Sequence, residues 1–218
     1  PCEAPSSIFI GLIGGVGDLI SAAPSVVALK KKYPDAQITF GVGDGIFFNT
    51  IKNDPNIDHF ETPFFYNVWK KRARRKTYRE KYREHDQVFL LDNGTYDWWK
   101  PRKHLLDIYA EKCGVSLKER RPIIYLNDND FEEAKKKLNE LGISNNDKFL
   151  VLSPETRSKK KMKEWPYDRF LSLIQKIRQN HDFKIVTLVS KENPYNYDGT
   201  IPLKGYPLGP SAAMISRS

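Results

Sequence analysis

The chain has 218 residues, of which 29% are charged, and its mean hydropathy is negative. This length fits one large domain or two modest ones, and the composition is that of a globular protein in water. No stretch approaches the run of about 18 apolar residues that a membrane helix needs, and no secretory signal precedes the first strand-like segment, so we expect a cytoplasmic protein. Cys2 and Cys113 fit neither a metal motif nor a disulfide framework, and we expect free thiols.

The formal net charge of +9 is concentrated in one stretch of the chain. Residues 70–83 contain nine basic side chains and one acid, Glu80, which leaves the remainder of the chain nearly balanced. A charge this local indicates an anionic partner for one face rather than a surface that coats nucleic acid. Such stretches are usually solvated helix faces, but unrelieved repulsion between neighbours four residues apart weakens that interpretation here. The basic residues are Lys70, Lys71, Arg72, Arg74, Arg75, Lys76, Arg79, Lys81 and Arg83.

Apolar strand-like runs alternate with helical patterns along the chain. The run at 8–13 leads into a glycine cluster, which is the pattern of a buried parallel strand followed by a tight turn. Strands that alternate with helices at these spacings predict an α/β fold with doubly wound parallel sheets. The expected strands are 8–13, 37–42, 87–91, 149–152 and 184–189, and the expected helices are 19–32, 46–52, 102–113, 130–141, 166–180 and 211–217.

A polar Gly/Ser/Asn stretch at 142–147 separates two patterned regions, and a new strand–loop–helix–strand unit begins there. We therefore expect two domains, at residues 1–146 and 147–218. The chain begins with Pro1 rather than Met and stops soon after a helix-like run, so we expect it to be a fragment of a longer protein.

Three glycines, Gly14, Gly15 and Gly17, lie between the first strand and the first helix. Glycines in this place let the backbone turn tightly and approach a ligand closely. The dinucleotide fingerprint fails because its third glycine would fall at Ile20, which disfavours a nucleotide-dependent oxidoreductase. A phosphate-binding P-loop fails because Asp18 follows Gly17, and a carboxylate would repel a phosphate. The loop is therefore expected to hold another kind of ligand against Asp18.

Asp18 has two interpretations. It caps the first helix, a structural role worth about 1 kcal/mol, or it is free on the loop for chemistry. Pro24 favours the second interpretation, because a proline beyond the first turn would kink a helix that began at Asp18. If Ser21 is the cap, Pro24 falls in the first turn and is tolerated. We expect the functional role for Asp18.

Several segments resemble, in order, those of glycosyltransferase family 9, the ADP-heptose:lipopolysaccharide heptosyltransferases. The most specific is GGVGDLISAAPSVVALKKKYPDAQITF at 14–40, which resembles the start of that family. The other segments are NDPNIDHF at 53–60, QVFLLDNG at 87–94, HLLDIYAEKCGV at 104–115, FLVLSPETRSKKKMKEWPYDRF at 149–170 and LKGYPLGPSAAMISRS at 203–218. The last resembles the stretch just before the family's acid-Ser-Gly…His motif, so the second domain is expected to be incomplete.

This resemblance implies a GT-B fold of two Rossmann-like domains, with inverting sugar transfer from an ADP-sugar donor and neither a metal nor a cofactor. By resemblance, Asp18 would be the base that deprotonates the acceptor hydroxyl, a role that contributes about 10²–10⁴-fold to the rate. Gly14, Gly15 and Gly17 would let the acceptor sugar come close. The basic residues Lys70, Lys71, Arg72, Arg74 and Arg75 would face the phosphates of an anionic glycolipid acceptor.

The same resemblance assigns donor contacts to the second domain. Thr156, Arg157 and Lys163 would bind the donor phosphates, and a cationic clamp there would stabilise the departing nucleoside diphosphate. Glu192, just past the next strand, would hold the nucleotide ribose. The basic stretch would also attract the protein to the cytoplasmic face of an anionic inner membrane, at about 1 kcal/mol per cation near the surface. No nucleic-acid partner is expected, because the chain lacks a recognisable RNA- or DNA-binding module.

Two alternatives stay open at the level of sequence. The first is a relative with the same fold that uses another nucleotide sugar and another acceptor. It stays open because the residues that select the donor's sugar are expected to lie largely outside this chain. A non-catalytic module would instead recognise phosphorylated glycans or lipids through residues 70–83.

Overall fold

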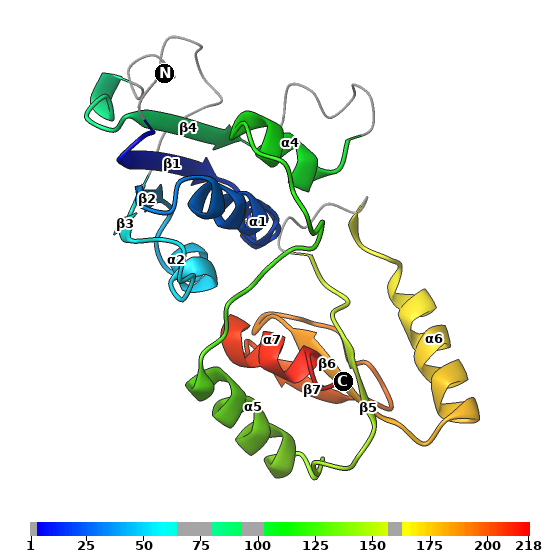
Figure 1. Ribbon diagram of the computed structural model, residues 1–218. Helices are drawn as coiled ribbons and strands as arrows, with labels where there is room; N and C mark the ends of the chain where they lie inside the picture. The colour runs from blue at the N-terminus through cyan, green and yellow to red at the C-terminus, as the bar shows by residue number, and fades with distance from the viewer. Residues whose placement is uncertain (1–3, 65–79, 93–102, 157–162) are drawn as a thin grey trace. The chain divides into compact units, whose positions relative to one another are not determined.

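The computed structural model describes residues 4–64, 80–92, 103–156 and 163–218 (Figure 1). These residues form two compact units that divide between Tyr125 and Leu126. The boundary expected at residue 146 is therefore displaced. Helix α5 (Asp128–Glu140) belongs to the second unit, because it packs against helix α7 (Leu208–Ile215) at the end of the chain.

The first unit is built on a four-stranded parallel sheet in the order β3-β2-β1-β4. In chain order its elements are β1 (Ser7–Ile13), α1 (Val16–Lys32), β2 (Gln37–Gly41), α2 (Ile46–Ile51), β3 (His59–Glu61), β4 (Gln87–Asp92) and α4 (Leu105–Lys112) (Figure 1). The chain moves from β1 outward to β2 and β3, and then returns to place β4 on the opposite side of β1. The strand order therefore reverses at β1, which makes the end of β1 a topological switch point.

Alternating side chains of β1 point to opposite faces of the sheet, as a pleated strand requires. Ile8, Ile10 and Leu12 are all at most 1% exposed and pack in the cluster that also contains apolar residues of α1, α2 and α4. Cys113, at the end of α4, lies in this core as a free thiol, as expected, and burial raises its pKa to about 12. Cys2 lies outside the described residues.

An aromatic cluster covers part of the other face of the first sheet. Phe9 stacks on Tyr82 with ring centroids 3.8 Å apart, and the edge of Phe64 meets the same Phe9 ring. Gly11 and Gly41 make room for this cluster, because a Cβ atom at either position would lie less than 3.0 Å from the Phe64 ring. Small residues on two neighbouring strands thus allow a large aromatic side chain to lie flat against the sheet.

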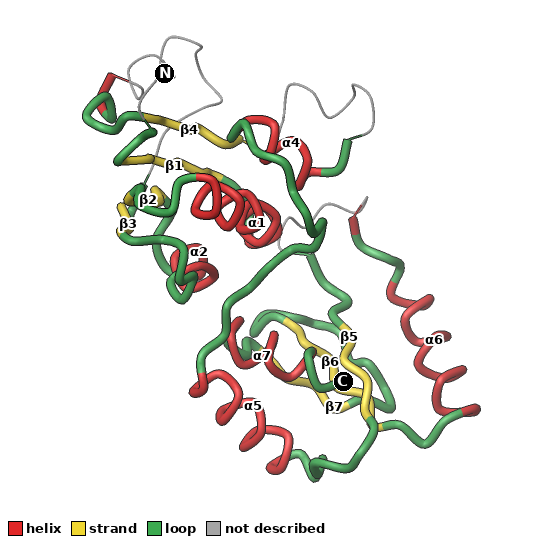
Figure 2. The backbone as a smooth tube through the Cα atoms, in the orientation of Figure 1, coloured by secondary structure: helices red, strands yellow, loops and turns green. Residues whose placement is uncertain are grey.

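The second unit is built on a three-stranded parallel sheet in the order β5-β6-β7. Its strands are β5 (Phe149–Leu152), β6 (Lys184–Val189) and β7 (Ile201–Lys204). Helix α6 (Tyr167–Asn180) covers one face, and α5 and α7 lie side by side on the other (Figures 1 and 2). Helices on both faces of a parallel sheet are the doubly wound arrangement that the sequence predicts.

The residue patterns alone predict neither β3 nor β7 as a strand. Both are short, and β7 contains Pro202, which disfavours strand assignment from sequence. Pairing with longer neighbours specifies both: β3 pairs with β2, and β7 pairs with β6. Isolated segments of three or four residues carry too little periodic signal to predict such pairing.

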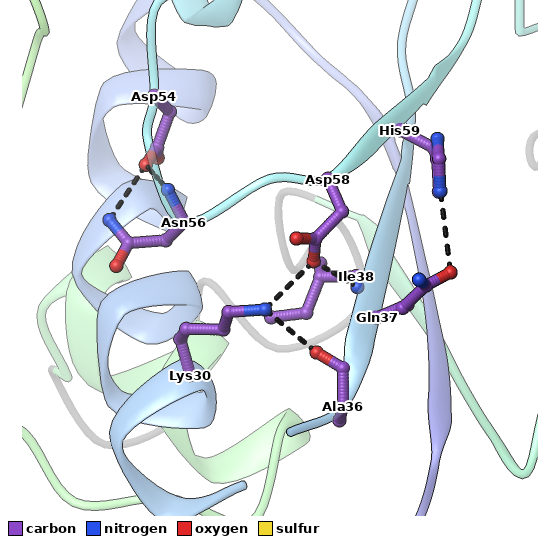
Figure 3. Close-up of polar contacts among 8 residues, drawn as sticks. All are labelled: Lys30, Ala36, Gln37, Ile38, Asp54, Asn56, Asp58 and His59. Atoms are coloured by element: carbon purple, nitrogen blue, oxygen red, sulfur yellow. Dashed lines mark hydrogen bonds and ion pairs between the residues drawn. The ribbon is translucent and has the colours of Figure 1, made fainter. Parts of the chain in front are cut away.

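Asp58 joins three elements at the amino end of the first sheet (Figure 3). Its Oδ2 accepts a hydrogen bond from the Ile38 N–H of β2 at 2.8 Å. The same oxygen forms an ion pair with the Lys30 ammonium of α1 at 2.9 Å. The same ammonium donates to the Ala36 carbonyl at 2.8 Å. Partial burial by itself would raise the pKa of Asp58, but the Ile38 N–H and Lys30 outweigh it and hold the pKa below its usual value.

We expect Asp58→Asn to lower the free energy of unfolding at pH 7 by about 1 kcal/mol, a modest loss because the Asp58 side chain is 33% exposed. A carboxyl whose pKa is depressed by folding stabilises the protein above its unfolded pKa of about 3.9, and this contribution disappears as pH falls through the folded pKa. Urea unfolding of both proteins should therefore show a difference at pH 7 that closes towards pH 3. The exposed Asp35 provides the control variant, Asp35→Asn, and a difference for Asp58→Asn that is constant with pH would contradict the assignment.

Candidate functional site

The glycine loop follows β1 at the switch point of the first sheet. In open α/β sheets, ligands bind in the crevice beyond the carboxyl ends of the strands, at the place where the strand order reverses. Gly14 and Gly15 form the turn between β1 and α1, and Asp18 follows within the first turn of α1. The topology therefore places the three candidate residues where such folds bind ligands, independently of any family resemblance.

The carboxylate of Asp18 is held by two donors. Its Oδ2 accepts a hydrogen bond from the Gly15 N–H at 2.6 Å, and its Oδ1 accepts one from the Tyr109 hydroxyl of α4 at 3.1 Å. The side chain is half-buried. Helix α1 begins at Val16 with Gly15 as its N-cap residue, so Asp18 is the third helical residue and satisfies the amide of the cap residue.

The expectation that α1 starts after Ser21 and leaves Asp18 free on the loop is wrong. Pro24 lies inside the helix instead. A proline in this position cannot donate a hydrogen bond to the carbonyl four residues earlier. That carbonyl belongs to Ile20, and it accepts a hydrogen bond at 3.0 Å from the Ile123 N–H, which comes from the segment after α4. The missing bond of the helix is thus replaced by a long-range one.

The three glycines of the loop differ in what they require. A Cβ atom at Gly14 would lie 2.6 Å from the Asp18 Cβ and 2.7 Å from its Cγ. The Asp18 carboxylate can therefore reach the Gly15 N–H only if residue 14 is a glycine. At Gly15 a Cβ atom would be in ordinary contact with Asp18, at 3.4 Å. At Gly17 a Cβ atom would meet nothing within 4 Å. Gly14 is therefore the glycine that the position of Asp18 depends on.

Tyr109 has no role predicted from the sequence, although it lies in the segment His104 to Val115 that carries part of the family resemblance. Tyr109 is fully buried and reaches Asp18 from another helix. A hydroxyl that donates to one carboxylate oxygen orients the carboxylate. When a tyrosine lies on the apolar face of a helix, the sequence does not reveal which residue its hydroxyl will form a hydrogen bond with.

The basic candidates of the first unit, Lys70, Lys71, Arg72, Arg74 and Arg75, lie outside the described residues. Lys81, which belongs to the same basic stretch, is described. Its ammonium donates to the Tyr82 hydroxyl at 2.8 Å and to Glu61 Oε1 at 3.2 Å, and these two contacts raise its pKa. The carboxyl end of this stretch thus packs against the sheet.

The donor candidates of the second unit lie at the carboxyl ends of β5 and β6. The Thr156 hydroxyl donates to Glu164 Oε1 at 3.3 Å, while Lys163 and Glu192 are exposed. Arg157 lies outside the described residues. The structure places Thr156 and Lys163 on the loop between β5 and α6, and Glu192 on the turn after β6.

Glu155 is a polar residue of this edge that the sequence analysis missed. Its carboxylate accepts hydrogen bonds from the Ser190 N–H, the Ser190 hydroxyl and the Asn193 side-chain amide. It therefore fastens the loop after β5 to the turn after β6. The sequence offers one indication of it: Glu155 is an acid three residues after β5, next to the basic loop to which the donor contacts were assigned.

Within the described ranges, no three His, Cys, Asp or Glu side chains gather in a way that could hold a metal ion. No helix in the described parts of the chain is both long enough and apolar enough to cross a bilayer. Neither finding tests the expectation of metal-independent transfer, which stays a prediction.

We expect Gly14→Ala and Gly17→Ala to change stability in opposite directions. The first substitution forces a Cβ atom against Asp18 and should lower the free energy of unfolding by about 1–3 kcal/mol. The second adds a methyl group in open space within a helix and should raise it by about 0.5 kcal/mol. Chemical denaturation of the two variants checks this, and equal effects would show that Asp18 does not constrain position 14.

No family model matches the sequence, and no curated protein is similar to it in sequence. Solved structures are similar in fold. A glycosyl transferase of family 9 from Veillonella parvula superposes with a TM-score of 0.69 at 16% identity, over 97% of this chain and 73% of that chain. The ADP-heptose lps heptosyltransferase II of E. coli gives 0.64 at 13% identity, over 97% and 76%. The E. coli heptosyltransferase WaaC with ADP gives 0.58 at 15%, over 95% and 77%. The chain thus has the α/β fold of these glycosyltransferases, as its sequence motifs predicted.

Proposed function

We propose that the protein is an inverting, metal-independent glycosyltransferase that moves a heptose from ADP-heptose to a lipopolysaccharide core acceptor. The observation that carries the proposal is the fold, which matches ADP-heptose heptosyltransferases over nearly the whole chain. The glycine loop with Asp18 at the switch point of the first sheet supports it further, because a carboxylate there is next to the expected ligand crevice.

In the proposed reaction, Asp18 takes the proton of the acceptor hydroxyl. The acceptor oxygen forms a bond to the anomeric carbon of the heptose while the bond from that carbon to the phosphate oxygen breaks, and ADP leaves with that electron pair. An ionised carboxylate offers about four lone-pair positions. The Gly15 N–H and the Tyr109 hydroxyl occupy two of these, so others are available for the acceptor hydroxyl. The two donors fix the carboxylate in one orientation, which is what a general base requires.

The donor is proposed to bind at the carboxyl edge of the second sheet. Thr156, Arg157 and Lys163 would contact the diphosphate and offset the charge that develops on ADP as it leaves. Glu192 would accept hydrogen bonds from the ribose hydroxyls. The exposure of Lys163 leaves its ammonium available to a ligand.

The acceptor is proposed to be an anionic glycolipid at the cytoplasmic face of the inner membrane. The basic residues at 70–75 would meet its phosphates and hold the protein at the membrane surface. The attraction is electrostatic, so it would weaken as ionic strength rises.

We expect Asp18→Asn to lower the rate of heptose transfer by about 10²–10⁴-fold and to leave the dissociation constant for ADP-heptose within about twofold. An amide oxygen at position 18 can still accept the Gly15 N–H, but it cannot take a proton at neutral pH. Transfer from ADP-heptose to a core acceptor, with calorimetry for donor binding, measures both quantities.

Asp130→Asn is the matched control for this variant. Asp130 is the third residue of α5, and its carboxylate accepts the Asn127 N–H at 3.1 Å, which is the same capping contact in the other unit. Turnover should be retained in Asp130→Asn. Unchanged turnover in Asp18→Asn would refute the catalytic role and leave Asp18 as a helix cap.

We expect Tyr109→Phe to lower kcat by about tenfold while KM stays within about twofold, because the lost hydroxyl orients the base and does not touch the substrate. Tyr82→Phe is the matched control, since Tyr82 is another buried tyrosine of the same unit whose hydroxyl donates to a carboxylate, that of Glu61. Steady-state kinetics of the two variants separates the outcomes. A similar loss of kcat in both would indicate general destabilisation rather than positioning of Asp18.

A further inference from the structure

The turn after β6 carries Glu192 between two residues that are both held in place. The Asn193 N–H donates to the Ser190 carbonyl at 3.2 Å, which closes a β-turn with Lys191 and Glu192 at its centre. The Glu192 side chain is exposed on this turn. The position of its carboxylate therefore depends on how firmly the two ends of the turn, Ser190 and Asn193, are held.

Glu155, on the loop after β5, holds both ends of this turn with one carboxylate. Its Oε2 accepts a hydrogen bond from the Ser190 N–H, and its Oε1 accepts one from the side-chain amide of Asn193. The Ser190 hydroxyl donates to the same Oε1 at 3.4 Å. Hydrogen bonds to a carboxylate are stronger than those between neutral groups, so Glu155 is a firm link between the two loops.

The Asn193 side chain is 5% exposed and uses both ends of its amide. Its Nδ2 donates to Glu155, and its Oδ1 accepts from the Tyr195 N–H at 2.8 Å. Burial raises the pKa of Tyr197, and a hydrogen bond with the Asn193 side chain opposes the rise. An amide turned the other way would place its NH₂ group against the Tyr195 N–H, donor against donor. The orientation of Asn193 is therefore fixed, with its donor towards Glu155.

The same turn also packs against the loop that follows β7. The Gly205 N–H donates to the Val189 carbonyl at 2.7 Å. The Lys191 side chain lies across Gly205, where a Cβ atom would be less than 3.0 Å from it. The carboxyl ends of β5, β6 and β7 are thus connected along the whole edge of the sheet, and the turn that carries Glu192 lies in the middle.

We infer that Glu155 and Asn193 are positioning residues, which hold Glu192 where it meets the ribose of a bound nucleotide. The inference rests on the proposed function, which assigns the donor to this edge of the sheet and the ribose to Glu192. In this role neither residue touches the ligand, and both act through the turn. A carboxylate that binds the ribose hydroxyls has to be held within about 0.5 Å of the productive position, which an unsupported exposed turn does not provide.

Glu155 and Asn193 allow an exchange of chemistry that keeps their size. Glu155→Gln alone places an NH₂ group against a donor, either the Asn193 amide or the Ser190 N–H. Asn193→Asp alone places two carboxylates side by side. Each single variant therefore loses the link between the loops.

The double variant Glu155→Gln/Asn193→Asp restores the link with its polarity reversed. The new amide at position 155 donates to the new carboxylate at position 193, and its oxygen still accepts from the Ser190 N–H. The carboxylate at position 193 still accepts from the Tyr195 N–H. The net charge is also that of the unaltered protein, so the double variant should recover what each single variant loses.

Calorimetry with ADP and with an ADP analogue that lacks both ribose hydroxyls measures the ribose contact. The unaltered protein should bind ADP about tenfold more tightly than the analogue. In Glu155→Gln and in Asn193→Asp, the dissociation constant for ADP should rise about tenfold while that for the analogue stays within about twofold, so the discrimination disappears. The double variant should bind ADP within about twofold of the unaltered protein.

Two further variants show whether the effect passes through Glu192. Glu192→Ala should lose the same discrimination, and Glu155→Gln should then weaken ADP by less than about twofold more, because the contact is already gone. Asp147→Asn is the matched control, since the Asp147 carboxylate accepts the Ser144 N–H at 2.8 Å in a turn before β5 of the same unit. It should change neither dissociation constant.

Three results would overturn the inference. They are discrimination that persists in Glu155→Gln, a double variant that stays as weak as the single ones, and equal losses for ADP and the analogue. The last result would show that the pair supports the fold of the unit in general rather than the position of Glu192.

The same titrations separate this inference from the proposed function. If ADP binds and weakens in Lys163→Ala while discrimination does not depend on position 155, the proposed donor site stands and the inference fails. If UDP or GDP binds in place of ADP, with discrimination that depends on both residues, the ADP donor is contradicted and the inference stands, because all three nucleotides contain the ribose. A protein that binds none of the three would contradict both.

Discussion

The contact between the Asp18 carboxylate and its two donors is the constraint on which the candidate site depends. It connects the end of β1, the first turn of α1 and the middle of α4, because the Gly15 N–H and the Tyr109 hydroxyl come from different elements. Gly14 is a glycine for the same reason, since any side chain there would occupy the space of the carboxylate. A single side chain thus determines the shape of the loop at the switch point of the sheet.

A helix cap and a general base make different demands on a carboxylate, yet they are compatible here. A cap uses one lone pair on one oxygen, and orientation by a buried hydroxyl uses another, so the acceptor capacity of the group is not exhausted. The structural role therefore fixes the orientation of the carboxylate without making it unavailable to a substrate.

The sequence predicted most of the fold and part of the site. The strands at 149–152 and 184–189 coincide with β5 and β6, because apolar residues run through both segments between polar turn residues. The start of α1 was misplaced, because the cost of Pro24 is offset by a hydrogen bond from Ile123 that no local pattern reveals. Tyr109 and Glu155 were missed for the same reason: each acts on a residue far away in the chain. The boundary near residue 146 failed because a polar turn after α5 resembles a linker, while the packing of α5 on α7 places that helix in the second unit.

The carbonyl of Ile20 has a consequence for how the first unit can be isolated. The stretch between α4 and Tyr125 has no regular secondary structure, yet its Ile123 amide supplies the hydrogen bond that Pro24 cannot donate, and the Tyr125 carbonyl accepts a further one from the Asn53 side chain. A recombinant piece that ended at Cys113 would therefore keep every helix and strand of the unit but expose a helical carbonyl in the middle of α1. The compact first unit extends to Tyr125, and a truncation series designed from secondary structure alone would stop too early.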